Sequence, residues 1–166
     1  MQIEIVPATV DQKPVIRHLL ELYLYDFSEF DGADVDSHGL YGYDHLDAYW
    51  VDEYRHPFLI RADGRWAGFA LVMEMGGGDQ AAFHWMAEFF VMRKYRRQGV
   101  GQQAACEVFD RFPGMWRVAQ IRTNEPAQRF WRTTIGHYTE GMFEEIEMEQ
   151  WKGPVQEFRS PPAHQV

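Results

Sequence analysis

An apolar run that ends in a basic, glycine-containing turn constrains this sequence more than any other feature. Residues 83–92 are dominated by apolar and aromatic side chains, which is typical of a central strand buried on both faces. The turn at 96–101 follows, and residues 102–112 then carry apolar side chains at helical spacing. A strand, a glycine turn and a helix in this order predict a domain of the α/β class.

The remaining segments extend this pattern along the chain. The order that we expect is a strand at 3–6, a helix at 15–27, a loop at 28–43, a short helix at 44–54, a hairpin at 57–73, the strand and helix described above, a strand at 116–122, a helix at 125–134 and one or two strands at 143–158. Neither an internal repeat nor a linker interrupts this order, so we expect one domain.

Size and charge limit the function classes. The 166 residues fit a single domain, and 25 acidic against 16 basic residues give a formal net charge of −9. A chain this acidic is a poor general binder of nucleic acid, because affinity for phosphate backbones depends on Lys and Arg. The acidity favours a cationic or amine partner, unless it serves solubility alone.

The cysteine count and the lengths of the apolar segments indicate the cellular compartment in which we expect the protein. Cys106 is the single cysteine, which excludes an internal disulfide and a multi-cysteine zinc site. Residues 1–5 lack the basic start and apolar run of a signal peptide, and no apolar stretch is long enough to span a bilayer. We therefore expect a cytoplasmic protein whose partners are neither membranes nor nucleic acids.

The turn at 96–101 has the chemistry of an anion site. Gly99 and Gly101 lack the Cβ atoms that would hold a ligand away from the backbone. The first amides of the following helix have no partner within that helix, and the helix dipole is positive at this end. Residues 93–97 add four basic side chains to a chain that is otherwise acidic. Such a turn suits a phosphate group.

Two other phosphate-binding patterns compete for this turn. A Walker loop ends in Gly-Lys-Ser/Thr, whereas Gly101 is followed by two glutamines. Residues 99–104 fit a loose dinucleotide fingerprint in which Ala104 replaces the third glycine. Neither a second βαβ half nor the acidic residue expected about 20 positions on accompanies this fingerprint. A nucleotide-binding protein is therefore a rival interpretation rather than the first.

Two segments together resemble the GNAT superfamily of N-acetyltransferases. Residues 89–101, Phe-Phe-Val-Met-Arg-Lys-Tyr-Arg-Arg-Gln-Gly-Val-Gly, are similar to the family's core motif, in which a strand runs into Arg/Gln-x-x-Gly-x-Gly/Ala and a helix. Residues 124–131, Asn-Glu-Pro-Ala-Gln-Arg-Phe-Trp, are similar to its Asn-x-x-Ala-x-x-Phe-Tyr helix. The two segments keep the family's order and separation, and the expected elements fit its fold over roughly residues 1–150.

The resemblance implies a fold, an activity and a cofactor. The fold is a single-domain α/β arrangement with a mixed, mostly antiparallel central sheet flanked by helices, here over residues 1–158, with a disordered tail at 159–166. The activity is direct transfer of an acetyl group from acetyl-CoA to a primary amine, without a metal. The residues that would contact acetyl-CoA are Val91, Met92, Arg96, Arg97, Gln98, Gly99, Val100, Gly101, Asn124, Phe130 and Trp131.

Within this set the resemblance implies separate roles. The turn would donate its amides to the pyrophosphate. Val91 and Met92 would lie where the sheet splays, beside the pantetheine arm, and a backbone N–H there would stabilise the oxyanion of the tetrahedral intermediate. Asn124 would contact the thiol end of the cofactor, and the aromatic pair at 130–131 would pack along it.

One position departs from the family pattern. Trp131 stands where the family often has a tyrosine that protonates the departing thiolate, and an indole N–H cannot supply that proton. Tyr138 is a nearby substitute for this acid. The departure also favours a rival function, a non-catalytic acyl-CoA-binding or regulatory module on the same fold.

Amine acetylation also needs a base, because most amines are protonated at neutral pH. Glu88 is a lone carboxylate in the apolar run at 83–92, where loss of solvent raises the pKa of a carboxyl group. The alternative is a structural glutamate at the sheet edge or in an ion pair. His84 is a second candidate base, or else a packed histidine. Cys106 is assigned to the core rather than to a nucleophile.

Residues 26–49 are the segment in which we expect the acceptor site. They mix acidic side chains with three tyrosines, a combination that favours a cationic acceptor through charge attraction and cation–π contact. A solvated acidic loop is the alternative. His38 and His45 lie among aspartates, but their spacing matches no metal-ligand pattern. The acceptor, a small molecule or a peptide amine, stays open, and a homodimer through the C-terminal strands is compatible with the sequence.

Overall fold

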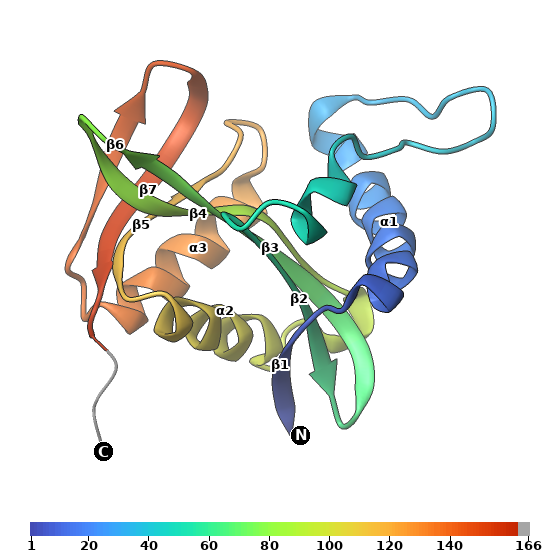
Figure 1. Cartoon of the computed structure of the whole chain (residues 1–166), viewed down its shortest axis with the longest axis horizontal. Coiled ribbons are helices and arrows are strands. Elements are labelled where there is room, and N and C mark those ends of the chain that lie inside the picture. The colour runs from blue at the N-terminus through green and yellow to red at the C-terminus, as the bar shows by residue number, and fades with distance from the viewer. Residues whose placement is uncertain (163–166) are drawn as a thin grey trace.

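The sheet organises the molecule (Figure 1). The computed structural model describes residues 1–162, and within them the chain forms a seven-stranded sheet with strand order β1-β2-β3-β4-β5-β7-β6. Neighbouring strands are antiparallel except β4 and β5, which are parallel. The elements are β1 (Ile3–Pro7), α1 (Lys13–Asp31), β2 (Arg55–Ala62), β3 (Arg65–Gly77), β4 (Gln80–Val91), α2 (Val100–Arg111), β5 (Gly114–Ala119), α3 (Glu125–Tyr138), β6 (Phe143–Met148) and β7 (Trp151–Ser160). The expected mixed, mostly antiparallel sheet flanked by helices is confirmed.

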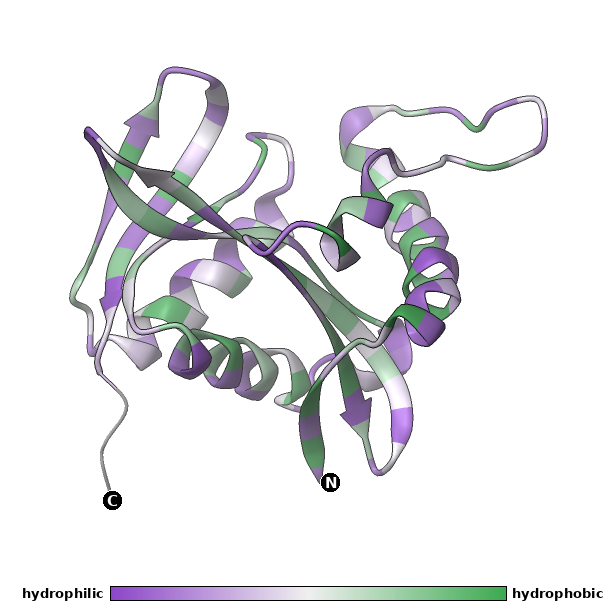
Figure 2. Ribbon diagram, in the orientation of Figure 1, coloured by the Kyte–Doolittle hydropathy of each residue, from purple (hydrophilic) through white to green (hydrophobic). Residues whose placement is uncertain are grey.

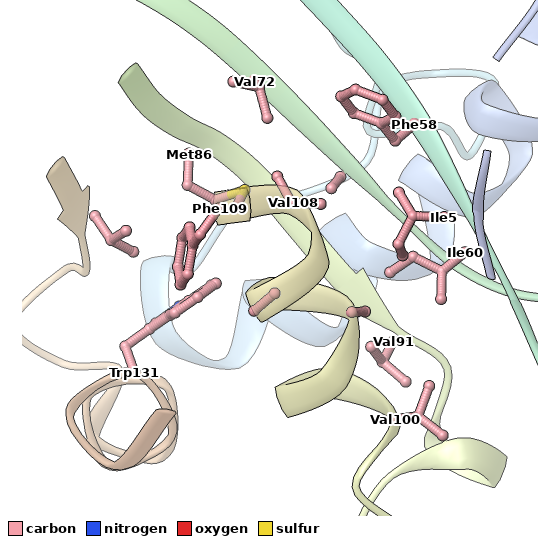
Figure 3. Close-up of a cluster of buried hydrophobic side chains, with 14 of the residues drawn as sticks. Ile5, Phe58, Ile60, Val72, Met86, Val91, Val100, Val108, Phe109 and Trp131 are labelled. Carbon is pink, nitrogen blue, oxygen red and sulfur yellow. The ribbon is translucent and has the colours of Figure 1, made fainter. Parts of the chain in front are cut away.

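Helices cover both faces of the sheet, because strand side chains alternate between two apolar cores. On one face, called the α1 face, Leu20 of α1 packs with Phe69 and Leu71 of β3. On the other, called the α2/α3 face, α2 and α3 cover the intervening strand residues, and Figure 3 shows Trp131 of α3 beside Phe109 of α2. Figure 2 shows the same division as apolar central strands with hydrophilic outer helix faces.

Local capping chemistry sets where the helices begin. The Oδ1 atom of Asn124 accepts the N–H of Ala127 at 3.1 Å, and Pro126 occupies the first turn of α3. Gly99 precedes α2 with a φ of 80°, a left-handed conformation that favours glycine. The segment that joins β4 to α2 is therefore a tight turn, as the sequence predicts.

β4 and β5 separate part-way along their length. Within residues 1–162 the two strands are in register at only two positions, His84 opposite Trp116 and Trp85 opposite Arg117. β4 continues to Val91 without further pairing on this side. The result is a V-shaped opening in the middle of the sheet.

A β-bulge in β4 lies at this opening. Ala87 is an extra residue without a partner in register on β3. Met86 and Phe89 pack in the core of the α2/α3 face, whereas Ala87 packs in the core of the α1 face. Glu88 also faces the α1 side, because its carboxylate accepts a hydrogen bond from Tyr43 at 3.3 Å. The bulge therefore allows two consecutive side chains to share the α1 face.

Several boundaries differ from the sequence-based expectation. α1 continues to Asp31, and a 3₁₀ turn at Leu46–Trp50 stands in place of the short helix expected at 44–54. β7 continues to Ser160, so the first two residues of the expected tail belong to the sheet; the Ser160 hydroxyl donates to the carbonyl of Phe109 at 2.9 Å. Residues 163–166 of that tail lie outside the described residues. None of the helices in the described part of the chain is both long and apolar enough to cross a membrane.

Candidate active site

A cavity of about 410 Å³ occupies the opening between β4 and β5. It is lined from both faces of the sheet, by residues that include Tyr23, Phe27 and Asp31 of α1, Trp85, Glu88 and Phe89 of β4, Asn124 and Trp131 at α3, and Trp151 of β7. A cavity of this size and shape is an ordinary small-molecule site. Because it passes through the sheet, two ligands can approach each other from opposite faces.

Glu88 lines this cavity from β4. Burial raises its pKa from 4.5 to about 7, although hydrogen bonds from Tyr23 and Tyr43 lower it. The desolvation outweighs the two hydroxyl donors because a charged carboxylate loses more by leaving water than two neutral hydrogen bonds restore. A carboxylate with a pKa near neutrality can both accept and release a proton at physiological pH.

Two tyrosines lie beside this carboxylate, and sequence analysis missed their role. The Tyr43 hydroxyl donates to Glu88 Oε1 at 3.3 Å, and the Tyr23 hydroxyl of α1 also lowers the pKa of Glu88. Burial, followed by the nearby charge of Glu88, raises the pKa of both phenols, so they remain donors. The sequence signal for this role was Tyr23, which lies within the apolar stripe of the helix expected at 15–27. A tyrosine hydroxyl that is buried in such a stripe needs a hydrogen-bond partner.

The loop that carries Tyr43 is fixed to α1 by a single side chain. The carboxylate of Glu21 accepts the backbone N–H of Tyr41 and that of Gly42, both at 2.9 Å. These two bonds set the direction in which the chain returns to the body of the protein (Figure 1). Most of the acidic loop before it is exposed, whereas Tyr43 is brought to the Glu88 carboxylate.

The turn before α2 presents free backbone amides. Among residues 1–162, no acceptor receives the N–H groups of Arg97, Gln98 and Gly99. The first hydrogen bond within α2 joins the Gln103 N–H to the Gly99 carbonyl at 3.0 Å, so the first-turn amides at 100–102 have no helical partner. Arg97 and Gly99 both have positive φ, 60° and 80°, a left-handed conformation of the kind that occurs in backbone nests.

Arg96 has a structural role that sequence analysis did not foresee. Its Nε donates to the carbonyl of Val91 at 2.7 Å, and its guanidinium pairs with Asp26. Asp26 also receives the Arg93 guanidinium at 2.7 Å. The Arg96 N–H is bonded to the Arg93 carbonyl at 3.2 Å. Arg96 therefore ties the turn to β4 and α1, and its own amide is not free for a ligand.

Val91 and Met92 differ in what their backbones offer. Met92 donates its N–H to Ala67 at 2.8 Å, and its carbonyl accepts from Tyr95 at 2.9 Å, so both groups are occupied. Because strand amides alternate in direction, the Val91 N–H points to the opposite edge, which β5 does not cover at this level. Val91, rather than Met92, presents a free donor at the opening.

Of the three cofactor contacts expected at α3, two line the cavity and one does not. Asn124 lines the cavity while its Oδ1 caps the helix. Trp131 lines the cavity and packs edge-on against Phe89, with ring centroids 5.0 Å apart. Phe130 is not among the residues that line the cavity; it lies over Gly101, where a Cβ would come within 3.1 Å of its ring. Gly101 is therefore small because α2 and α3 approach closely there.

Three other candidates lie away from the cavity. The structure does not bring Tyr138 to Glu88: its hydroxyl lies 2.7 Å from Asp110 Oδ1, to which it donates, and 2.8 Å from the hydroxyl of Ser160. Tyr138 lies seven residues beyond Trp131, about 10 Å further along α3. His84 packs at a tilted angle against Trp116 on the α2/α3 face, with ring centroids 5.3 Å apart. Burial raises the pKa of the Cys106 thiol to about 11, which keeps it protonated.

The histidines and acidic residues do not assemble a metal centre within the described range. No group of three or more His, Cys, Asp or Glu side chains in residues 1–162 is placed to hold a metal ion. Asp36, one of the loop aspartates, instead accepts the backbone N–H groups of His38 and Leu40.

Comparison with protein families gives one match. The model of the acetyltransferase (GNAT) family matches residues 17–136, from α1 to the end of α3. No curated protein matches the sequence.

Solved structures share the fold at low sequence identity. An acetyltransferase from Thermus thermophilus superimposes with a TM-score of 0.70 at 14% identity, over 96% of this chain and 97% of that one. The ribosomal-protein-S18-alanine N-acetyltransferase from Escherichia coli gives 0.63 at 14% identity, over 99% and 97%. An aminoglycoside acetyltransferase from an uncultured soil metagenomic sample, in complex with sisomicin, gives 0.64 at 15% identity, over 90% and 95%.

Proposed function

The chain belongs to the acetyltransferase (GNAT) family, and from this premise we propose that it transfers the acetyl group of acetyl-CoA directly to a primary amine of a cationic acceptor. The observation that carries the proposal is the position of Glu88, a half-buried carboxylate in a cavity that is lined from both faces of the sheet. The named acceptors of similar structures range from a ribosomal-protein alanine to an aminoglycoside, so the fold leaves the acceptor open.

The turn and the opening support a binding path for the cofactor. The free amides at 97–102 suit the pyrophosphate of acetyl-CoA, in a part of the chain that is locally basic. The pantetheine arm then extends past Val91 and Phe89 into the opening, on the α2/α3 face, with Asn124 and Trp131 as its walls. This arrangement leaves the α1 face of the cavity for the amine.

Glu88 is the base in this proposal. The acceptor enters as an ammonium ion and gives one proton to the Glu88 carboxylate, whose pKa near 7 suits that exchange. The neutral nitrogen attacks the acetyl carbon and the C–N bond forms. As the C–S bond breaks, the nitrogen gives its second proton to the departing sulfur, and coenzyme A leaves as the thiol. The Val91 N–H stabilises the oxyanion of the tetrahedral intermediate. Tyr138 has no part in these steps, since it does not reach the cavity.

An amine-panel assay tests this function. The protein is incubated with acetyl-CoA and single amines, free thiol is followed in time, and the acetylated product is identified by mass spectrometry. Glu88→Gln should lower the rate by about 100-fold or more, while coenzyme A affinity, measured by titration calorimetry, stays unchanged. Tight binding of coenzyme A without turnover of any amine would contradict the proposal and favour the regulatory-module alternative.

A further inference from the structure

The α1 face of the cavity is walled by aromatic rings. We call this part the acceptor half, and its residues are Tyr23, Phe27, Asp31, Trp85, Glu88 and Trp151. Resting on the function proposed above, we propose that the acceptor is a small primary amine with one positive charge and an apolar, preferably aromatic, body. Polyamines and polyhydroxylated polycations are excluded as preferred acceptors.

The rings of the acceptor half form two contacting pairs. Trp85 and Trp151 meet edge to face, with centroids 5.9 Å apart and planes at 78°. Tyr23 and Phe27 lie on successive turns of α1, with centroids 5.7 Å apart. The Trp151 Nε1–H donates to the Gln120 carbonyl at 3.0 Å. Because this N–H is occupied, the indole offers the cavity its apolar surface and its π-face rather than a polar contact.

The charges of the acceptor half suit a single cation. Glu88 is the carboxylate that would meet the reacting nitrogen, and Tyr43 is already hydrogen-bonded to it. Asp31 lies at the end of α1, is exposed, and already accepts the Ala33 N–H at 2.9 Å. A second ammonium would have only the exposed Asp31 as a further carboxylate in this half. A set of hydroxyls would be desolvated against rings that offer no conventional acceptor, at a cost for each unpaired group.

The size of the cavity limits the acceptor further. The whole space measures about 410 Å³ and has to admit the acetyl end of the cofactor as well as the amine. An arylalkylamine fills the remaining volume with its ring against the Trp85–Trp151 pair and its nitrogen toward Glu88. An acceptor with several sugar rings would project into solvent and leave the aromatic wall uncovered.

A three-amine comparison tests the inference. 2-Phenylethylamine, spermidine and kanamycin are assayed separately with acetyl-CoA, and kcat/KM for 2-phenylethylamine should exceed the other two by about tenfold or more. The uncharged analogue 2-phenylethanol should inhibit competitively against 2-phenylethylamine, because the wall binds the ring without the charge. Equal or better turnover of spermidine or kanamycin overturns the inference and leaves the proposed function intact. Turnover of no amine at all overturns both.

Variants of the wall provide a second readout. Trp151→Ala should raise KM for 2-phenylethylamine about tenfold with kcat nearly unchanged, and Trp151→Phe should recover most of the affinity. Tyr54→Ala, which removes an exposed ring outside the cavity, is the matched control. If Trp151→Ala does not fold, Phe27→Ala is measured in its place. An unchanged KM in a folded wall variant contradicts the inference.

Discussion

Replacing Glu88 by glutamine should stabilise the folded protein above neutral pH while removing most of its activity. The amide has nearly the shape of the carboxylate, and its oxygen still accepts a hydrogen bond from Tyr43. It carries no charge, so the folded state no longer holds an ionised group away from water. A gain in stability coupled to a loss of turnover is expected where a buried group serves catalysis.

The magnitude follows from the pKa of Glu88, which burial raises from 4.5 to about 7. The folded state then binds the proton more tightly than the unfolded chain does. The associated stability is fully present below about pH 4.5 and is lost as the pH rises to about 7 and above. Each pKa unit corresponds to about 1.4 kcal/mol, so the loss amounts to about 3 kcal/mol. In a chain of this size that corresponds to a shift in Tm of roughly 6–12 °C.

Thermal unfolding of the ligand-free protein, followed by circular dichroism at several pH values, measures this effect. The Tm of Glu88→Gln should equal that of the wild type near pH 4.5 and exceed it by several degrees at about pH 8.5. Glu144→Gln on β6 is the control, because that side chain is exposed and its replacement should leave Tm unchanged at both pH values. Equal Tm values of Glu88→Gln and wild type at the higher pH would refute the argument that Glu88 is held ionised against a desolvation cost.

Three further predictions concern the positioning of the site and the fold around it. Tyr43→Phe removes a hydrogen bond that lowers the pKa of Glu88, so the midpoint of the rising limb of the kcat/KM–pH profile should move to higher pH; an unmoved midpoint would contradict this coupling. Arg96→Ala removes the bond to the Val91 carbonyl and should weaken coenzyme A binding about tenfold in titration calorimetry, whereas Arg65→Ala should not. Gly153→Ala should lower the unfolding free energy by about 3 kcal/mol in a urea titration, because its φ is 152° and a Cβ would lie 2.1 Å from the Gln120 carbonyl oxygen. Gly136→Ala, where the Cβ makes an ordinary 3.7 Å contact, should be neutral or stabilising.

The sequence by itself determined the local units of this protein. The strand at 83–92, the turn at 96–101 and the Asn124 cap are each recognisable within about a dozen residues, because glycine conformation, helix capping and apolar periodicity are local properties. These units were enough to predict the α/β class and, through a resemblance, the family that the family model then matched. They were also enough to single out Glu88, since a lone carboxylate in an apolar strand is a local signal.

Only the tertiary structure decided which side chains meet. The direction of Glu88 depends on the bulge at Ala87, which exists only through the register of β4 against β3. Its partner Tyr43 is 45 residues away and reaches it on a loop that Glu21 holds from α1. Tyr138 shows that residues close in sequence can lie apart. It is only seven residues from Trp131, but seven residues along a helix separate two side chains by about two turns. Local chemistry therefore predicted the glycine turn and the candidate base, whereas long-range pairing decided what surrounds that base and which face of the sheet it occupies.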